Sequence, residues 1–167
     1  MEAVLMMGLR PEGTKLFKGK IKTLCLTTTL HYYRPPKSGD DLEQTVMITS
    51  NGYVKVHRRV SNGWKREKSY DFNIKNVRVI TEERKMPSGQ TVRILNRIRR
   101  YFAETHLGCY ICDSSGEWQL ELTNTEGDIF LFDGFFDDYR ESLSRTSNLI
   151  RAATGLKYFL GFCDDNQ

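Results

Sequence analysis

The sequence contains no apolar run long enough to cross a membrane. The longest run near its start, in MEAVLMMGLR, lies between Glu2 and Arg10, far short of the ~20 residues that a membrane-spanning helix needs. The same segment lacks the cationic leader of a signal peptide. We therefore expect an intracellular, cytoplasmic protein without a membrane partner.

The sequence also lacks the residue sets that would indicate a metal, redox or hydrolytic centre. It has one Cys-x-x-Cys pair, Cys109 and Cys112, and no second ligand pair at the spacing of a structural zinc site. That pair precedes an expected hairpin rather than opening a helix, as a thioredoxin-like motif would. The three histidines share no spacing with a serine, cysteine or carboxylate that suggests a triad. We therefore expect reduced thiols, no cofactor and no bound metal.

Linkers, repeats and low-complexity segments are absent as well. The 167 residues suit one domain, and 39% hydrophobic and 28% charged residues are ordinary globular values. Residues 1–167 are therefore predicted to form a single domain.

Charge is distributed unevenly along the chain. Residues 1–104 carry 21 basic and 10 acidic side chains, or +11, whereas residues 105–167 carry 4 and 11, or −7. Such asymmetry favours a partner of negative charge for the first part, provided that the fold does not interleave the two parts.

The first half of the sequence has the pattern of antiparallel strands. Residues 21–34 are rich in Thr, Leu and Tyr, and residues 44–60 alternate around Asn51-Gly52, which predicts a hairpin. A second Asn-Gly, at 62–63, leads into WKREKSYDF, the expected third strand of a meander. Lys55 and His57 alternate with valines and are expected to face away from the core.

The stretch RILNRIRRYF, residues 93–102, is amphipathic at helical spacing. With Ser88 as N-cap, Val92, Leu95, Ile98 and Phe102 share one arc, with Ile94 at its edge. Arg93, Asn96, Arg97 and Arg100 fall on the opposite arc. A hairpin between residues 77–80 and 92–95 is the alternative.

The residue pattern in the last third of the sequence predicts a second hairpin, a second helix and a final strand. Residues 116–132 alternate around Glu126-Gly127, and residues 139–154 show a helical arc that ends before Gly155. LKYFLGF, residues 156–162, resembles a short strand. The predicted fold class is α+β, an antiparallel meander and hairpin sheet with two packed helices.

The segments GEWQLELTNTEG, residues 116–127, and LSRTSNLIR, residues 143–151, resemble a group of uncharacterised bacterial proteins. Its members pair a Gly-x-Trp-x-Leu hairpin with a Leu-Ser-x-x-x-x-Leu-Ile-Arg helix. The resemblance extends loosely over about two thirds of the chain, through ITSNG at 48–52 and Tyr101-Phe102. The chain differs from the group around residues 82–90 and at its end, DDNQ. The resemblance implies one shared fold and carries over no catalytic residue.

Basic residues are the strongest functional signal. The helical arginines stand at i, i+4 and i+7, although Glu104 would neutralise part of this stripe. Further basic residues follow in the expected meander. The predicted site for nucleic acid or an acidic protein surface comprises Arg93, Arg97, Arg100, Arg58, Arg59, Lys65, Arg66 and Lys68.

Two other functions compete with binding through this basic surface. Asp71 with Glu83 and Lys85 has the residue types of a Mg²⁺-dependent nuclease, in which carboxylates bind the metal and a lysine positions water. The aromatic residues of 130–136 would instead suit a structural or oligomeric protein if they were exposed: Phe130, Phe132, Phe135 and Phe136.

The sequence favours a binding module over an enzyme. The small size, the charge and the lack of an enzyme motif would suit a bacterial or phage protein. Such a protein would serve a mobile element by inhibiting a nuclease complex of the host. The choice among these functions depends on whether the basic segments share one face.

Overall fold

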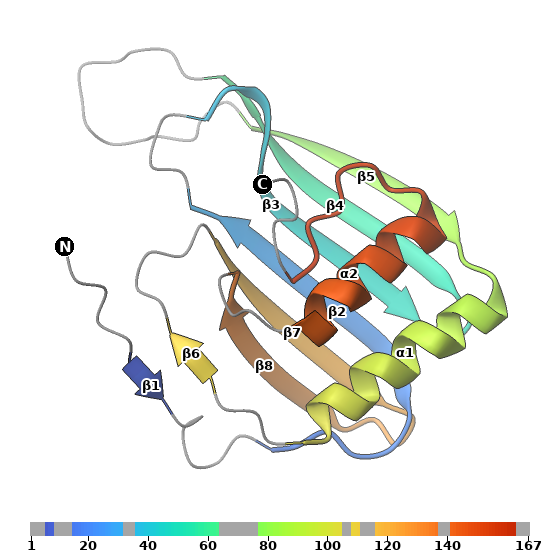
Figure 1. Ribbon diagram of the computed structural model, residues 1–167. Coiled ribbons are helices and arrows are strands. Elements are labelled where there is room, and N and C mark those ends of the chain that lie inside the picture. Colours follow the sequence, from blue (N-terminus) through green and yellow to red (C-terminus); the bar gives the residue numbers. More distant parts are fainter. Residues whose placement is uncertain are drawn as a thin grey trace.

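The described residues form two helices and eight strands (Figure 1). The structure is a computed structural model, and it describes residues 6–8, 15–31, 36–63, 77–104, 108–110, 116–136 and 141–162. The elements are β1 (Met6–Gly8), β2 (Ile21–Leu30), β3 (Ser38–Thr49), β4 (Tyr53–Asn62), β5 (Val77–Lys85), α1 (Ser88–Phe102), β6 (Gly108–Tyr110), β7 (Gly116–Asn124), β8 (Ile129–Phe135) and α2 (Glu141–Thr154).

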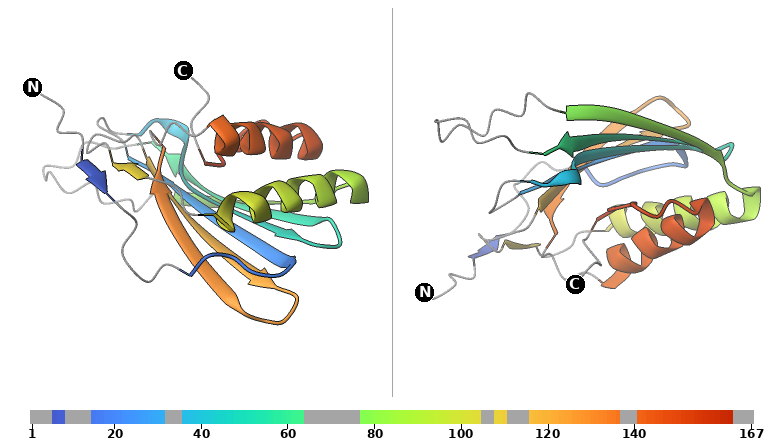
Figure 2. Two further views of the ribbon diagram at one scale, coloured as in Figure 1. Left: turned by 60° about the horizontal axis from the view of Figure 1, so that its bottom comes forward. Right: turned by 90° about the horizontal axis from the view of Figure 1, so that it is seen from above.

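The main sheet has six antiparallel strands in the order β5-β4-β3-β2-β7-β8, and β1 pairs with β6 separately. Both helices lie on one side of the main sheet (Figure 2). The predicted α+β class, with an antiparallel sheet and two helices, is confirmed. Neither helix of the described residues is long and apolar enough to span a membrane.

Both predicted hairpins are present, as β3–β4 and β7–β8. In the first, the Gly52 amide donates to Thr49 O at 2.9 Å, and Gly52 has φ +86° while Asn51 keeps a negative φ. This is a three-residue loop that ends in a left-handed glycine. Asn51 therefore contributes its side chain rather than a positive φ, since its Oδ1 accepts a hydrogen bond from the Tyr53 amide.

The third strand of the meander is β5, which pairs with β4 along its whole length. The strand predicted in WKREKSYDF lies outside the described residues. The alternative hairpin between residues 77–80 and 92–95 is wrong, because the first segment belongs to β5 and the second to α1.

Helix α1 is confirmed, with two corrections. Pro87 rather than Ser88 occupies the N-cap position, and no side chain of the described part caps the helix. Val92 is 56% exposed, whereas Thr91 and Ile94 are buried. Thr91 can occupy the core because its hydroxyl donates to Pro87 O, one turn earlier.

Helix α2 ends as predicted, but residues 156–162 form turns rather than a strand. Gly155 has φ +65°, and its amide donates to Arg151 O. The segment after it crosses the helix side of the sheet, where Gln44 of β3 bonds Tyr158 O and the Leu160 amide. The inner strands already have two neighbours each, so no ladder position remains there for another strand.

Trp118 lies at the centre of the core, on the helix side of β7. Its ring is 6.1 Å from that of Phe102 in α1 and 5.1 Å from that of Phe162 after α2. It extends over Gly134 of β8, where a Cβ would come within 2.3 Å of the indole. The two hairpin strands and the helix layer are thus joined through one side chain that is 2% exposed.

We expect Trp118→Ala to lower the free energy of unfolding by roughly 3–5 kcal/mol, the usual cost of deleting a large core aromatic side chain. Urea unfolding measures the change. Gln119→Ala, at the exposed neighbouring position, is the control and should change stability by about 0.5 kcal/mol or less. An unchanged unfolding midpoint for Trp118→Ala would contradict the packing role.

Candidate polyanion-binding surface

Three of the predicted site residues lie together on α1. Arg93 and Arg100 are exposed and Arg97 is half-buried, on the arc opposite Ile94, Leu95 and Ile98. We call Arg93, Arg97 and Arg100 the arginine arc. Within the described part of the chain, none of the three forms an ion pair with a carboxylate.

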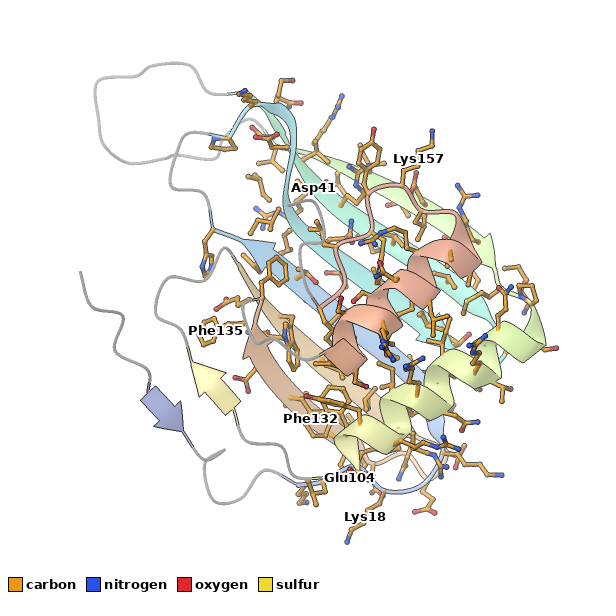
Figure 3. The ribbon with its side chains drawn as sticks, in the orientation of Figure 1. Lys18, Asp41, Glu104, Phe132, Phe135 and Lys157 are labelled. Atoms are coloured by element: carbon orange, nitrogen blue, oxygen red, sulfur yellow. The ribbon has the colours of Figure 1, made fainter. Side chains whose placement is uncertain are left out.

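Glu104 does not neutralise the arginine arc as expected. It follows the end of α1 (Figure 3), is exposed, and makes no ion pair with Arg100 within the described residues. Ala103 keeps helical dihedral angles and its amide donates to Arg99 O, whereas the next amide, that of Glu104, donates to Tyr101 O at 3.4 Å. Glu104 therefore lies just past the last α-helical turn, at the end of the path on which an i, i+4 pair would form.

Sequence reasoning missed further arginines of the helix layer. Arg99 of α1 is half-buried, and its Nε is buried without a hydrogen-bond partner among the described residues. Arg145 is exposed on α2, and the Arg151 guanidinium donates to Phe159 O at 2.8 Å. Arg145 and Arg151 were missed because they lie in the last third of the chain, which is net acidic. Arg99 was missed because it lies at the edge of the polar arc of α1.

Counted by element, the helix layer is strongly basic. Helix α1 carries four arginines and no acidic residue, and α2 carries two arginines and Glu141. Six positive charges minus one negative charge give +5 for the two helices. The layer therefore presents positive charge on one side of the molecule.

The basic residues of β4 lie on the other side. Lys55, His57 and Arg59 alternate with the buried Val54, Val56 and Arg58, so they point away from the helices, as predicted for Lys55 and His57. We call this side of the six-stranded sheet the open face. Lys55 and Arg59 do not share a surface with the arginine arc.

Carboxylates offset the basic residues of the open face. Lys55 pairs with Glu83 at 3.4 Å, and Arg59 pairs with Glu43 at 3.5 Å. Among the strand residues that are paired in the sheet, this face carries three basic and five acidic side chains. The basic ones are Lys55, Arg59 and Lys85, and the acidic ones are Glu43, Glu83, Glu117, Glu121 and Asp133. Three positive minus five negative charges give −2, so the described strands give the open face a net negative charge.

Arg58 is buried and is removed from the candidate surface. Its guanidinium donates to both carboxylate oxygens of Asp41, with Nη2 to Oδ2 at 2.9 Å, and lies 4.4 Å from the ring centroid of Tyr158. Burial raises the pKa of the Asp41 carboxyl, although the hydrogen bonds and charge of Arg58 oppose this. The side chain thus anchors the segment after α2 to the sheet.

Of the three residues of the nuclease alternative, the structure describes Glu83 and Lys85. Glu83 and Lys85 both point to the open face of β5, where Glu83 pairs with Lys55 and Lys85 donates to Asn51 O. Asp71 lies outside the described residues, as do Lys65, Arg66 and Lys68 of the binding prediction. The part of the chain that the structure describes contains no group of three or more potential metal ligands.

Among the side chains that the structure describes, neither Cys25 nor the buried aromatic residues of the cluster provide a site. Burial raises the pKa of the half-buried Cys25 thiol, and the charge of Glu121 raises it further, so the thiol is a poor nucleophile. Cys109 lies in β6, and Cys112 and Cys163 are outside the described residues. Of the clustered aromatics, Phe130, Phe132 and Phe136 are buried in the chain's own core.

No protein-family model matches this chain, and neither a curated protein nor a solved structure matches it significantly. The fold and the placement of charge therefore carry the functional argument. The resemblance to the uncharacterised bacterial group stays a prediction.

We expect Arg58→Met and Asp41→Asn each to destabilise the protein by about 2–4 kcal/mol, because each leaves the other group buried without its partner. The double variant should lose less than the sum of the two single losses. Urea unfolding at neutral pH measures this cycle, with Arg59→Met as the exposed control. Additive losses would contradict the coupling.

Proposed function

We propose that the protein is a non-enzymatic binding module that contacts nucleic acid through the arginine arc of α1. One observation carries the proposal: Arg93, Arg97 and Arg100 share one surface of a helix that contains no acidic residue, and none has a carboxylate partner among the described residues. A surface with this charge and no internal counter-ion favours a polyanionic partner.

The spacing of the arc suits a phosphate backbone. From Arg93 to Arg100 the helix rises by about 10 Å, the axial rise of about three phosphates along one DNA strand. Guanidinium groups bind phosphate in a bidentate manner and stay charged at all physiological pH values. The basic charge of α2 extends the attraction without needing a base contact.

The arc lacks an aromatic side chain on which a base could stack. Tyr101 and Phe102 of α1 are buried, and Val92 is the exposed apolar residue of the helix. Stacking platforms are typical of single-strand binders, whereas phosphate contacts position a protein without reading sequence. Binding is therefore proposed to involve the backbone, with little dependence on base sequence.

An acidic protein surface would satisfy the same charge. The phosphate spacing favours nucleic acid, and the protein partner is kept as an outcome of the test. A mobile-element inhibitor of a host nuclease complex would be one such module, a prediction from the character of the chain alone.

Asp71, Glu83 and Lys85 are not included in the proposed site, because the Glu83 carboxylate is engaged by Lys55 and also accepts a hydrogen bond from Tyr53.

We expect replacement of Arg93, Arg97 and Arg100 with Gln to weaken binding to a short duplex that accommodates one protein copy. The slope of log K against log salt should flatten by nearly one unit for each lost phosphate contact, or about 2.7 units in all. Stability should change by about 0.5 kcal/mol or less, since the side chains lie on the surface. Fluorescence anisotropy across a salt series measures both the affinity and the slope.

The matched control replaces Lys55, Arg59 and Lys85 with Gln, which removes the same charge from the open face. It should keep most of the wild-type slope. Equal losses in the two variants would mean that net charge rather than the arc drives binding. If wild type binds neither DNA nor RNA at low salt, the proposal fails, and a pull-down that compares wild type with the arc variant would then test an acidic protein partner.

A further inference from the structure

The open face of the sheet is the large surface that the proposed function leaves unused. No described element covers it, since both helices lie on the other side (Figure 2). It carries the apolar strand residues that are most exposed, namely Val79 at 65%, Ile129 at 59% and Leu131 at 68%. These residues lie on the edge strands β5 and β8, one at each side of the face.

The strand register orders the side chains of the open face into rows that run across all six strands. From β5 to β8, one row is Glu83, Lys55, Met47, Cys25, Glu121 and Leu131. The row four residues away, two rows further along the strands, is Val79, Arg59, Glu43, Thr29, Glu117 and Phe135. In both rows the cation stands on β4 and a carboxylate stands on β7.

The cations on β4 and the carboxylates on β7 form two columns of opposite charge, which are placed symmetrically about the middle of the sheet. β4 is the second strand from one edge and β7 is the second strand from the other. The strands between them, β3 and β2, contribute mainly uncharged side chains, among them Thr45 and Thr27, whose hydroxyls are 3.3 Å apart. The face is therefore complementary in charge to its own image after a half-turn.

We propose that the open face is the interface of a twofold-symmetric dimer of this chain. A rotation by 180° about an axis parallel to the strands, between β3 and β2, lays β4 over the partner's β7 and β5 over the partner's β8. Because this axis is parallel to the strands, each row faces the same row of the second copy. Such an isologous contact uses one patch on both copies and closes at two subunits.

The rotation brings opposite charges together at four places. Lys55 faces the partner's Glu121 and Arg59 faces the partner's Glu117, and each pair occurs twice. Packed sheets are rotated by about 30° relative to each other, a displacement that long Lys and Arg side chains can follow at these strands. The same operation brings Val79 toward the partner's Phe135, which removes apolar surface from water at both edges.

The carboxylates of β7 differ from the cations of β4 in having no ion pair within the described part of the chain. Within the described part of the chain, neither Glu117 nor Glu121 forms an ion pair. The existing pairs of Lys55 and Arg59 are partly exposed, with side-chain exposures of 33% and 47% for the two cations. Their ammonium and guanidinium groups have further donors available for a second carboxylate.

The dimension of the face indicates a dimer of moderate strength. Six strands at about 4.8 Å spacing and four rows at about 6.8 Å give a buried area of about 1,000 Å² for both copies together. This is the lower end of specific interfaces, and much of it is polar. The dimer should therefore form with a strong dependence on protein concentration and on salt.

The test is a charge exchange between two variants of the full chain. Lys55→Glu with Arg59→Glu places like charges opposite one another in its own dimer, and so does Glu117→Lys with Glu121→Lys. Each variant alone should dimerise roughly 100-fold more weakly than wild type, or worse, because like charges face each other at four places. Mixed in equal amounts they should form a heterodimer, since all four contacts then join opposite charges.

Sedimentation velocity over a concentration series at low salt measures the association constants of wild type, of each exchange variant and of their mixture, and circular dichroism checks that each variant is folded. Val79→Asn, at the position that faces the partner's Phe135, offers a second measurement that leaves charge unchanged, and it should also weaken the dimer. The arginine-arc variant, with Arg93, Arg97 and Arg100 replaced by Gln, should dimerise like wild type.

Three outcomes would overturn the proposal. These are a wild-type chain that stays monomeric throughout the series, exchange variants that dimerise as strongly as wild type, or a mixture that regains no dimer. Because the open face lies opposite the arginine arc, a failure here would leave nucleic-acid binding untouched, and the reverse also holds.

Discussion

A sheet that is covered by helices on one face only must keep its apolar side chains on that face, and this constraint governs the rest of the molecule. Each inner strand alternates, so Val54 and Val56 of β4 meet the helix layer while Lys55 and His57 meet solvent. The helices in turn complete the core with a single apolar arc each. Their remaining surface is free to carry charge, and every charged residue of α1 is an arginine.

Charge is consequently sorted between faces rather than between the halves of the sequence. β4 from the basic part of the chain and β7 from the acidic part lie in one sheet, separated by only β3 and β2. Their exposed side chains therefore offset each other on the open face. The helix layer has no comparable acidic column, so it retains a net charge of +5 from six arginines and Glu141.

Local signals in the sequence predicted the hairpins and both helices, because turn glycines and apolar periodicity act over a few residues. Long-range partners were not visible. The alternation of β4 already pointed Arg58 inward, yet its counter-ion Asp41 is 17 positions earlier in a strand whose register shifts nearby. Similarly, LKYFLGF has strand composition, but Gln44 and Ser147 hold it across the core as turns. The arginine arc was predictable since one helix contains all of it.

The two proposed surfaces lie on opposite sides of a two-layer structure, and this placement decides how they could act together. In a dimer joined through the open faces, the helix layers point outward in opposite directions. Two arginine arcs so arranged cannot lie along the same short stretch of duplex, so dimerisation adds little to the binding of a short nucleic acid. A long or looped molecule can reach both arcs, and its second contact is then intramolecular and gains from a high effective concentration. The geometry thus favours joining separate segments of nucleic acid over a longer continuous footprint on one.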